Sequence, residues 1–325
     1  MTGKRLKTDG EGQGVSDRSI VCANKVSRSF RNTAALCELD LCIEPGELFG
    51  LVGPDGAGKT TALRLMAAVM RPTSGSLSVT GYDSVKRAEA IRAHVGYMPQ
   101  RFSLYADLSV LENLHFYADI FGVHGDERQR HIEQLLGFAH LTEFTDRRAG
   151  QLSGGMQKKL ALACTLIHQP DVLLLDEPTT GVDPVSRREF WDILTDLHVA
   201  STTIVVSTPY MDEAERCNRV GLLFQGRLIE CDAPDTIKAR VPGQLIELQP
   251  EPLKRAQALL TSRHDVIEVQ VYGDLLHIFV EDAFVHMPRL KAFLEANGVQ
   301  VRRMRVVPPR MEEAFISLIR KRQAA

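Results

Sequence analysis

The sequence lacks a long hydrophobic run and carries almost no net charge. No stretch approaches the roughly 20 apolar residues that a membrane-spanning helix needs, and the longest apolar runs, at 172–175 and 220–224, have the length of strands. The formal net charge is -2 over 325 residues, so no global field favours nucleic acid as a partner. We therefore expect a chain that neither crosses a membrane nor binds nucleic acid.

Cysteine pairs of the C-x-x-C type are also missing. Most of the cysteines stand in apolar or helical stretches, which is typical of small buried hydrophobes and favours a reducing compartment. The six are Cys22, Cys37, Cys42, Cys164, Cys217 and Cys231. Residues 1–18 lack the apolar core of a signal peptide and are rich in Lys, Gly, Asp and Gln, so we expect a disordered, solvated tail there.

The rest of the chain has the composition of an ordinary globular protein, and its length favours two unequal domains. From residue 19, strands alternate with helices, and the runs DVLLLDEP and TTIVVST are typical of strands buried on both faces of a parallel sheet. A helix-rich section is inserted at about 101–166. Pro and Gly interrupt the pattern at 241–244, so we predict an α/β domain at 19–241 and a second domain at 245–325.

The second domain has the predicted order β-α-β-β-α-β, which is the split βαβ arrangement of ferredoxin-like α+β domains. Its helices are expected at 253–262 and 288–296, and its central strands should turn at Gly273-Asp274. A closing helix at 311–320 should pack against it. Such a fold can bind metabolites, pair with a copy of itself or brace the main domain, and the fold alone does not decide among these roles.

A glycine-rich loop carries the most specific motif. Residues 53–60 satisfy G-x-x-x-x-G-K-[ST] between an apolar strand and a predicted helix at 61–69, so main-chain N–H groups and the helix N-terminus can surround phosphate oxygens. Lys59 should reach the β- and γ-phosphates of ATP, and the Thr60 hydroxyl should coordinate Mg²⁺. The predicted nucleotide-binding residues here are Gly53, Pro54, Asp55, Gly56, Ala57, Gly58, Lys59, Thr60 and Thr61.

Two carboxylates end the hydrophobic strand VLLLDE. An apolar sheet does not tolerate them inside unless they face a metal or a cleft, and the carboxyl ends of such strands are where α/β proteins bind ligands. Asp176 is predicted to hold Mg²⁺ through its water shell, and Glu177 to act as general base for the water that attacks the γ-phosphate. Taken alone, the pair could equally be a solvated strand end.

The segment LSGGM at 152–156 resembles the signature sequence of ABC ATPases, and its place shortly before the acidic strand strengthens the resemblance. Ser153, Gly154 and Gly155 should cap a helix that starts near Met156, making a further anion-binding helix N-terminus. Met156 replaces the usual glutamine, a variation that export-type members commonly show. The resemblance covers 19–240 and implies a P-loop NTPase fold, an ABC cassette with a mostly parallel sheet and an inserted helical subdomain.

Three further positions match the ABC pattern in order. Phe30 stands where the family places an aromatic that stacks on adenine, and Gln100, in YMPQ, matches the glutamine that contacts Mg²⁺ and the attacking water. Asp183, in GVDP, matches the aspartate of the D-loop at the interface between two cassettes. The resemblance thus implies Glu177, Gln100 and Lys59 as catalytic residues, and Thr60, Gln100 and Asp176 as metal ligands.

The resemblance also implies partners. Two cassettes meet head to tail, each ATP lying between the phosphate loop of one and the signature of the other, and their closure drives transmembrane permease subunits from the cytoplasmic face of the plasma membrane. The segment 101–113 is where a permease helix should dock. The solute is touched by the permease, so its identity lies outside this sequence, although the similarity to multidrug efflux and daunorubicin-resistance ATPases favours export of drugs or other small apolar molecules.

One position departs from the family pattern. Pro209 stands where the family places a histidine that contacts the γ-phosphate, and proline has neither a side-chain donor nor a backbone N–H. We expect ATP and Mg²⁺ binding with slowed turnover, which favours pairing with a second, complete cassette, a homodimer remaining possible. Two alternatives stay open: a degenerate cassette that holds ATP as a regulatory clamp, and a non-transport ABC ATPase acting on ribosomes or DNA.

Overall fold

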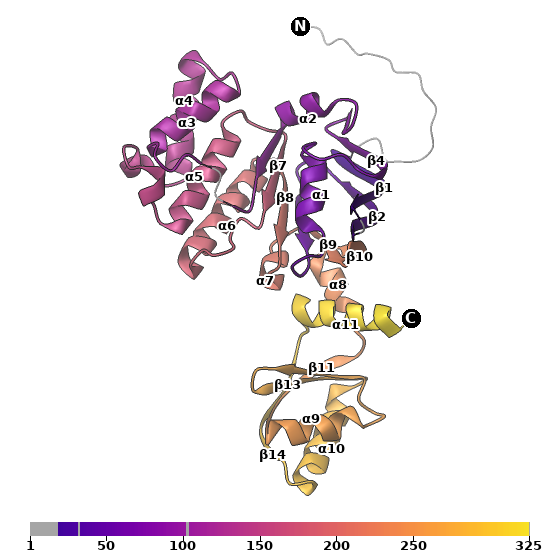
Figure 1. The fold of residues 1–325 in the computed structure, drawn as a ribbon. Helices are drawn as coiled ribbons and strands as arrows, with labels where there is room; N and C mark the ends of the chain where they lie inside the picture. The colour runs from indigo at the N-terminus through magenta and orange to yellow at the C-terminus, as the bar shows by residue number, and fades with distance from the viewer. Residues whose placement is uncertain (1–18, 32, 102–103, 325) are drawn as a thin grey trace.

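The computed structural model describes residues 19–324, except residues 32, 102 and 103. The predicted tail at 1–18 and part of the predicted docking segment at 101–113 lie outside the described residues. Three sheets organise the described chain (Figure 1). Two of them build the N-terminal part, 19–241, and the third builds the C-terminal part, 242–324.

The central sheet of the N-terminal part has the order β10-β9-β3-β8-β7-β6. All neighbours run parallel except β9 and β10, which form an antiparallel pair. Leucine and β-branched residues make β7 and β8 wholly buried, as predicted for strands covered on both faces. The strands are β3 (Leu48–Val52), β6 (Val95–Met98), β7 (Val172–Asp176), β8 (Thr203–Thr208), β9 (Arg219–Phe224) and β10 (Arg227–Asp232).

Different helices cover the two faces of this sheet. Because successive strand residues point to opposite faces, Phe49 and Leu51 pack with α1 (Lys59–Met66), whereas Leu48 and Val52 pack with α5 (Gly154–Leu166) and α6 (Pro184–Val199). Shorter helices complete the layers: α2 (Ala88–His94), α7 (Met211–Ala214) and α8 (Pro234–Ala239). The loop that precedes α1 and the sequence that begins α5 therefore belong to helices on opposite faces of one sheet.

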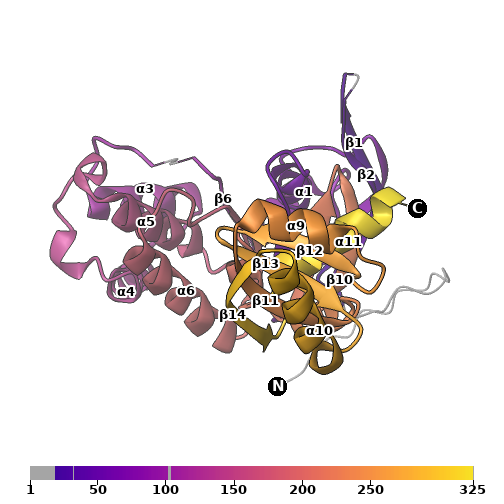
Figure 2. The same ribbon diagram turned by 90° about the horizontal axis from the view of Figure 1, so that it is seen from below.

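The helix-rich section forms a lobe beside the sheet, which Figure 2 shows projecting to one side. It contains α3 (Val110–Ile120), α4 (Gly125–Phe138) and the short turns η1 (Thr142–Phe144) and η2 (Ala149–Gln151), and one side of α5 packs with them. Ser109 caps α3 in a reciprocal pair with Glu112, which fixes where that helix begins. Leu114, Ile132 and Leu160 belong to a core cluster of this lobe.

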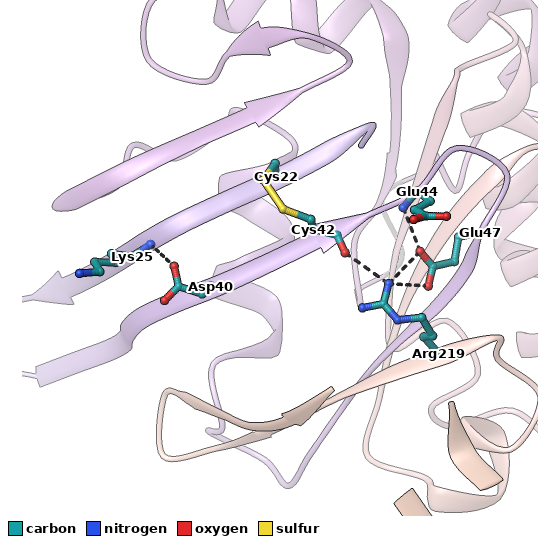
Figure 3. The surroundings of a disulfide bond; sticks show 7 residues. All are labelled: Cys22, Lys25, Asp40, Cys42, Glu44, Glu47 and Arg219. Carbon is teal, nitrogen blue, oxygen red and sulfur yellow. Dashed lines mark hydrogen bonds and ion pairs between the residues drawn. A yellow bond between two sulfur atoms is a disulfide. The ribbon is translucent and has the colours of Figure 1, made fainter. Parts of the chain in front are cut away.

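A second, antiparallel sheet has the order β2-β1-β4-β5 and holds a disulfide between Cys22 and Cys42 (Figure 3). The two cysteines are direct partners in the register of β1 (Val21–Phe30) and β2 (Thr33–Ile43), with Cα atoms 4.2 Å apart. This pairing was not predicted, because strand register, which spacing along the sequence does not give, brings the two cysteines face to face. The remaining strands are β4 (Ser74–Val79) and β5 (Tyr82–Asp83).

The C-terminal part has the predicted ferredoxin-like order, in a fully antiparallel sheet β12-β13-β11-β14. One helix differs from prediction: α10 begins at Ala283 rather than at 288, because the Asp282 carboxylate caps it, and Pro288 lies inside it. The elements are β11 (Gln244–Glu251), α9 (Leu253–Thr261), β12 (Glu268–Tyr272), β13 (Leu275–Val280), α10 (Ala283–Ala296) and β14 (Gln300–Val307).

The closing helix α11 (Met311–Ala324) lies between the two parts of the molecule (Figure 1). Its apolar residues Met311, Ala314 and Phe315 join a core cluster that contains residues of both parts, among them Phe279 of β13, and the helix contacts α7 and α8. Its polar side turns to the C-terminal part, where Glu313 pairs with His277 at 3.0 Å. The helix packs against the C-terminal part as expected, and its apolar face also packs against the N-terminal part. The sequence did not indicate the second contact, because an apolar stripe does not reveal which core it fits.

Candidate functional site

The phosphate loop joins β3 to α1 and closes on its own lysine. The ammonium of Lys59, buried except for 3% of its surface, donates to the carbonyls of Gly53 at 2.8 Å and Pro54 at 3.0 Å. Gly58 has a φ of 108°, and a Cβ there would lie 2.5 Å from the Ala35 carbonyl, so only glycine fits. Close approach to the main chain of β2 thus shapes the loop.

The two carboxylates predicted at the end of β7 stand directly against this loop. Thr60 donates its hydroxyl to Asp176 Oδ1 at 3.0 Å, and Lys59 Nζ lies 3.1 Å from Glu177 Oε1. Both carboxylates are buried. Since an isolated buried carboxylate is costly, these contacts offset the cost of burying the pair.

Glu177 is held from its other side by residues of two loops. Gln100 donates its side-chain amide to Glu177 Oε2 at 2.7 Å, and the Thr180 hydroxyl lies 3.3 Å from the same oxygen. The main chain at Glu177 has a φ of 46°, a left-handed conformation that is costly for glutamate, and its N–H donates to Ser207 on β8. The structure therefore fixes the direction of this carboxylate from both its side chain and its backbone.

Three residues of the site escaped the sequence reasoning. The Ser207 hydroxyl donates to Asp176 Oδ1 at 2.8 Å, and the Tyr97 hydroxyl lies 3.4 Å from Asp176 Oδ2. Lys158 donates to the main-chain carbonyl of Gln100 at 2.7 Å. Burial lowers the pKa of Lys158, whereas the charges of Asp176 and Glu177 act to raise it. Ser207 reaches Asp176 because β8 lies beside β7 in the sheet, and no motif at position 207 indicates that contact.

The donors present suit magnesium. Mg²⁺ prefers oxygen ligands, keeps several waters and is normally shared between one or two protein oxygens and the phosphates of its substrate. The Thr60 hydroxyl and the Asp176 carboxylate supply such oxygens side by side. Among the residues that the structure describes, there is no group of three or more His, Cys, Asp or Glu side chains that could hold a metal ion.

Phe30 is exposed over 42% of its surface at the end of β1, with the Arg28 guanidinium 4.7 Å above its ring. An exposed ring can offer a face to an adenine. The hairpin that carries it also touches the phosphate loop, because Leu36 on β2 packs against Gly58. The hairpin that carries Phe30 therefore lies against the phosphate loop. Stacking of Phe30 on adenine stays a prediction.

The signature and D-loop residues meet each other on the far face of the sheet. Ser153 caps α5 by accepting from Met156 N at 3.3 Å, so the helix begins at Gly154. Gly155 lies against Ser186 of α6. Asp183 caps α6, and hydrogen bonds from Ser186, and more weakly from Val185, lower the pKa of its carboxyl. These residues begin helices on the face of the sheet opposite α1, the helix that follows the phosphate loop.

Pro209 follows β8 directly and is anchored by its neighbours. Glu213 of α7 is buried and accepts from the hydroxyls of Thr208 at 2.5 Å and Thr179 at 2.6 Å, and from Arg187 at 2.7 Å. This network fixes the chain on both sides of residue 209. A proline there offers no hydrogen-bond donor to a phosphate.

No helix within the described part of the chain is long and apolar enough to span a bilayer. A family model described as ABC transporter matches residues 36–180. The "Probable multidrug ABC transporter ATP-binding protein YbhF" of Escherichia coli is 39% identical over 313 residues, covering 93% of this chain and 52% of the relative. The chain therefore spans about half the length of that relative.

Relatives of similar length and solved structures agree. The "Nod factor export ATP-binding protein I" of Burkholderia thailandensis is 38% identical over 270 residues, covering 82% of this chain and 88% of the relative. A dimeric ATP-binding cassette, MJ0796, bound to ADP and Pi, superposes with a TM-score of 0.60 at 26% identity, covering 66% of this chain and 98% of that one. The cbiO1 subunit of Clostridium perfringens gives a TM-score of 0.64 at 25% identity, covering 69% and 92%.

Proposed function

The chain belongs to the ABC transporter family as an ATP-binding subunit, and from that premise we propose that it binds and hydrolyses Mg·ATP to power a membrane exporter. The observation that carries the proposal is the contact of Lys59 and Thr60 with the adjacent carboxylates Asp176 and Glu177. A cationic phosphate loop and a buried carboxylate pair at the ends of parallel strands are the parts that phosphoryl transfer to water requires.

The residues act by exchange of partners. When phosphates enter the loop, the Lys59 ammonium turns from the carbonyls of Gly53 and Pro54 and from Glu177 to the β- and γ-oxygens. Glu177, released from that ion pair, becomes a free acceptor for a water proton, and Gln100 keeps it aimed. Thr60 and Asp176 would hold Mg²⁺, which supplies charge neutralisation at the terminal phosphates.

The second half of each ATP site is proposed to come from another cassette. Ser153, Gly154, Gly155 and Asp183 lie where helices begin on the face of the sheet opposite α1, so they are available to the ATP of a partner. Since Pro209 cannot donate to a γ-phosphate, turnover at this chain's own loop should be slow, and a partner with a complete site is favoured over a homodimer.

Export is the proposed direction of transport. Two of the relatives are named for multidrug transport and for Nod factor export. We place the chain on the cytoplasmic face of the plasma membrane, bound to transmembrane permease subunits near the segment 101–113, whose described part includes the half-exposed Tyr105. Drugs or other small apolar molecules are the proposed solutes.

A regulatory clamp is the second candidate, and the donor-free Pro209 favours it. Glu177→Gln discriminates between the two, because it removes the base and keeps the shape of the side chain. If this site does chemistry, the variant binds Mg·ATP at least as tightly as the wild type, while turnover of the assembled transporter falls at least tenfold. Unchanged turnover of Glu177→Gln supports the clamp. A separate binding measurement tests the loop: Lys59→Ala should lose ATP binding, whereas Lys254→Ala, at an exposed site, should keep it.

A further inference from the structure

Lys158 connects two functional surfaces that the fold otherwise keeps apart. It lies on α5, little more than one turn after the helix begins at Gly154, and its ammonium donates to the Gln100 carbonyl at 2.7 Å. We propose that Lys158 is a positioning residue for hydrolysis, which holds the Gln100 main chain so that the Gln100 amide stays on Glu177. The inference rests on the proposed ATPase function and adds a residue to its machinery.

Gln100 is gripped at two points. Its side-chain amide donates to Glu177 at 2.7 Å, and its main-chain carbonyl accepts from Lys158. The strand β6 ends at Met98, so the ladder of the sheet no longer fixes the chain when it reaches Gln100. A hydrogen bond from a charged donor is stronger than a neutral one, and here it sets the orientation of a peptide group whose side chain reaches the base.

Lys158 is the cation that holds the Gln100 main chain. Lys59, the other cation of the site, is in direct contact with Glu177 and is required by the phosphates once ATP enters. Lys158 lies outside the phosphate loop, so it can remain beside Gln100 through that exchange.

The same lysine belongs to the helix whose N-terminus carries the signature. If α5 shifts when Ser153 meets a partner's ATP, Lys158 shifts with it, because the helix is one rigid element. The Gln100 main chain, which Lys158 holds, would then move as well. Its neighbour Lys159 is committed elsewhere, in an ion pair with Glu189 of α6. Lys159 thus joins α5 to α6, whereas Lys158 joins α5 to Gln100 at the ATP site.

The test compares Lys158→Met and Lys158→Arg with Lys254→Met, a control at an exposed lysine on α9. Hydrogen exchange of the main-chain amides of Met98, Gln100 and Arg101 in the nucleotide-free chain should speed up at least threefold in Lys158→Met, stay near wild type in Lys158→Arg, and be unchanged in the control. The affinity for Mg·ATP should stay within about twofold of wild type in all three, since none touches the phosphate loop. Exchange at 98–101 that is unaltered in Lys158→Met would overturn the proposal.

A double-mutant cycle then separates positioning from general destabilisation. Lys158→Met should lower the turnover of the assembled transporter about tenfold, as expected for loss of one charge-assisted hydrogen bond. In a Gln100→Ala background the same change should cost less than twofold, because the side chain it positions is gone. An equal loss in both backgrounds refutes the role. A wild-type chain that fails to bind Mg·ATP refutes the proposed function instead.

Discussion

Gly155 offers a sharp test of how the signature surface is built. A Cβ at this position would lie 2.4 Å from Ser186 Cβ and 2.5 Å from its hydroxyl oxygen. Ordinary contacts between carbon atoms are about 3.5–4.0 Å, so Gly155→Ala forces the starts of α5 and α6 apart by roughly 1 Å. Gly154→Ala is the matched control, because the nearest atom to its Cβ is the Gly181 carbonyl oxygen at 4.0 Å.

The expected cost follows from two opposing terms. Overpacking of this kind costs about 1–3 kcal/mol, and replacing glycine by alanine in a helix returns up to about 1 kcal/mol. Gly155→Ala should therefore destabilise the protein by roughly 1–2 kcal/mol, which corresponds to a fall in Tm of about 2–8 °C for a part of this size. Gly155→Ala combined with Ser186→Gly removes both clashing atoms and should return to within about 1 kcal/mol of wild type.

Thermal unfolding of the four proteins is the assay, followed by turnover of the assembled transporter. The displaced signature should lower turnover up to about a hundredfold in Gly155→Ala, because a shift of 1 Å is enough to misplace a reacting group. Binding of Mg·ATP to the chain alone should be unchanged. The reasoning is refuted if Gly155→Ala unfolds like Gly154→Ala, or if adding Ser186→Gly fails to restore stability.

Three further outcomes are expected. Pro209→His supplies the absent donor and should raise turnover at this chain's own site about tenfold, measured in an assembly whose other site is disabled; no gain would contradict the assignment of residue 209. Phe30→Ala should weaken binding of ATP several-fold and that of inorganic triphosphate not at all, because stacking requires the base; equal effects on both ligands would exclude a stacking role. Non-reducing mass spectrometry should find Cys22 joined to Cys42, and reduction should lower Tm, since closing a loop of 20 residues is worth about 3 kcal/mol; two free thiols would contradict the structure.

Site motifs made of residues that are close in the sequence could be predicted from the sequence. The loop at 53–60 and the strand ending in Asp176 each show a local pattern, and parallel strands bring their carboxyl ends to one edge, so their meeting follows from fold class. The capping role of Ser153 is likewise local, since it accepts from Met156 three residues on. The order of the C-terminal part was also readable from alternation and turn residues.

Features that depend on long-range register were not predictable. Cys22 and Cys42 pair because two strands align at that point, and Ser207 meets Asp176 because β8 lies beside β7. The apolar stripe of α11 fits no one core by its sequence, and only the assembled fold shows that Phe315 joins a cluster shared by both parts. The contact of Lys158 with the Gln100 carbonyl likewise cannot be predicted from the spacing of residues along the sequence.

The most direct test of the account is the ATPase rate of the purified chain, alone and after assembly with a second, complete cassette and the permease. We predict that the chain alone binds Mg·ATP but turns over near background, and that assembly raises the rate per chain at least tenfold, with one copy of this chain in each pair. Full activity of the chain alone, as a homodimer, would contradict the claim that Pro209 makes it one half of an asymmetric pair.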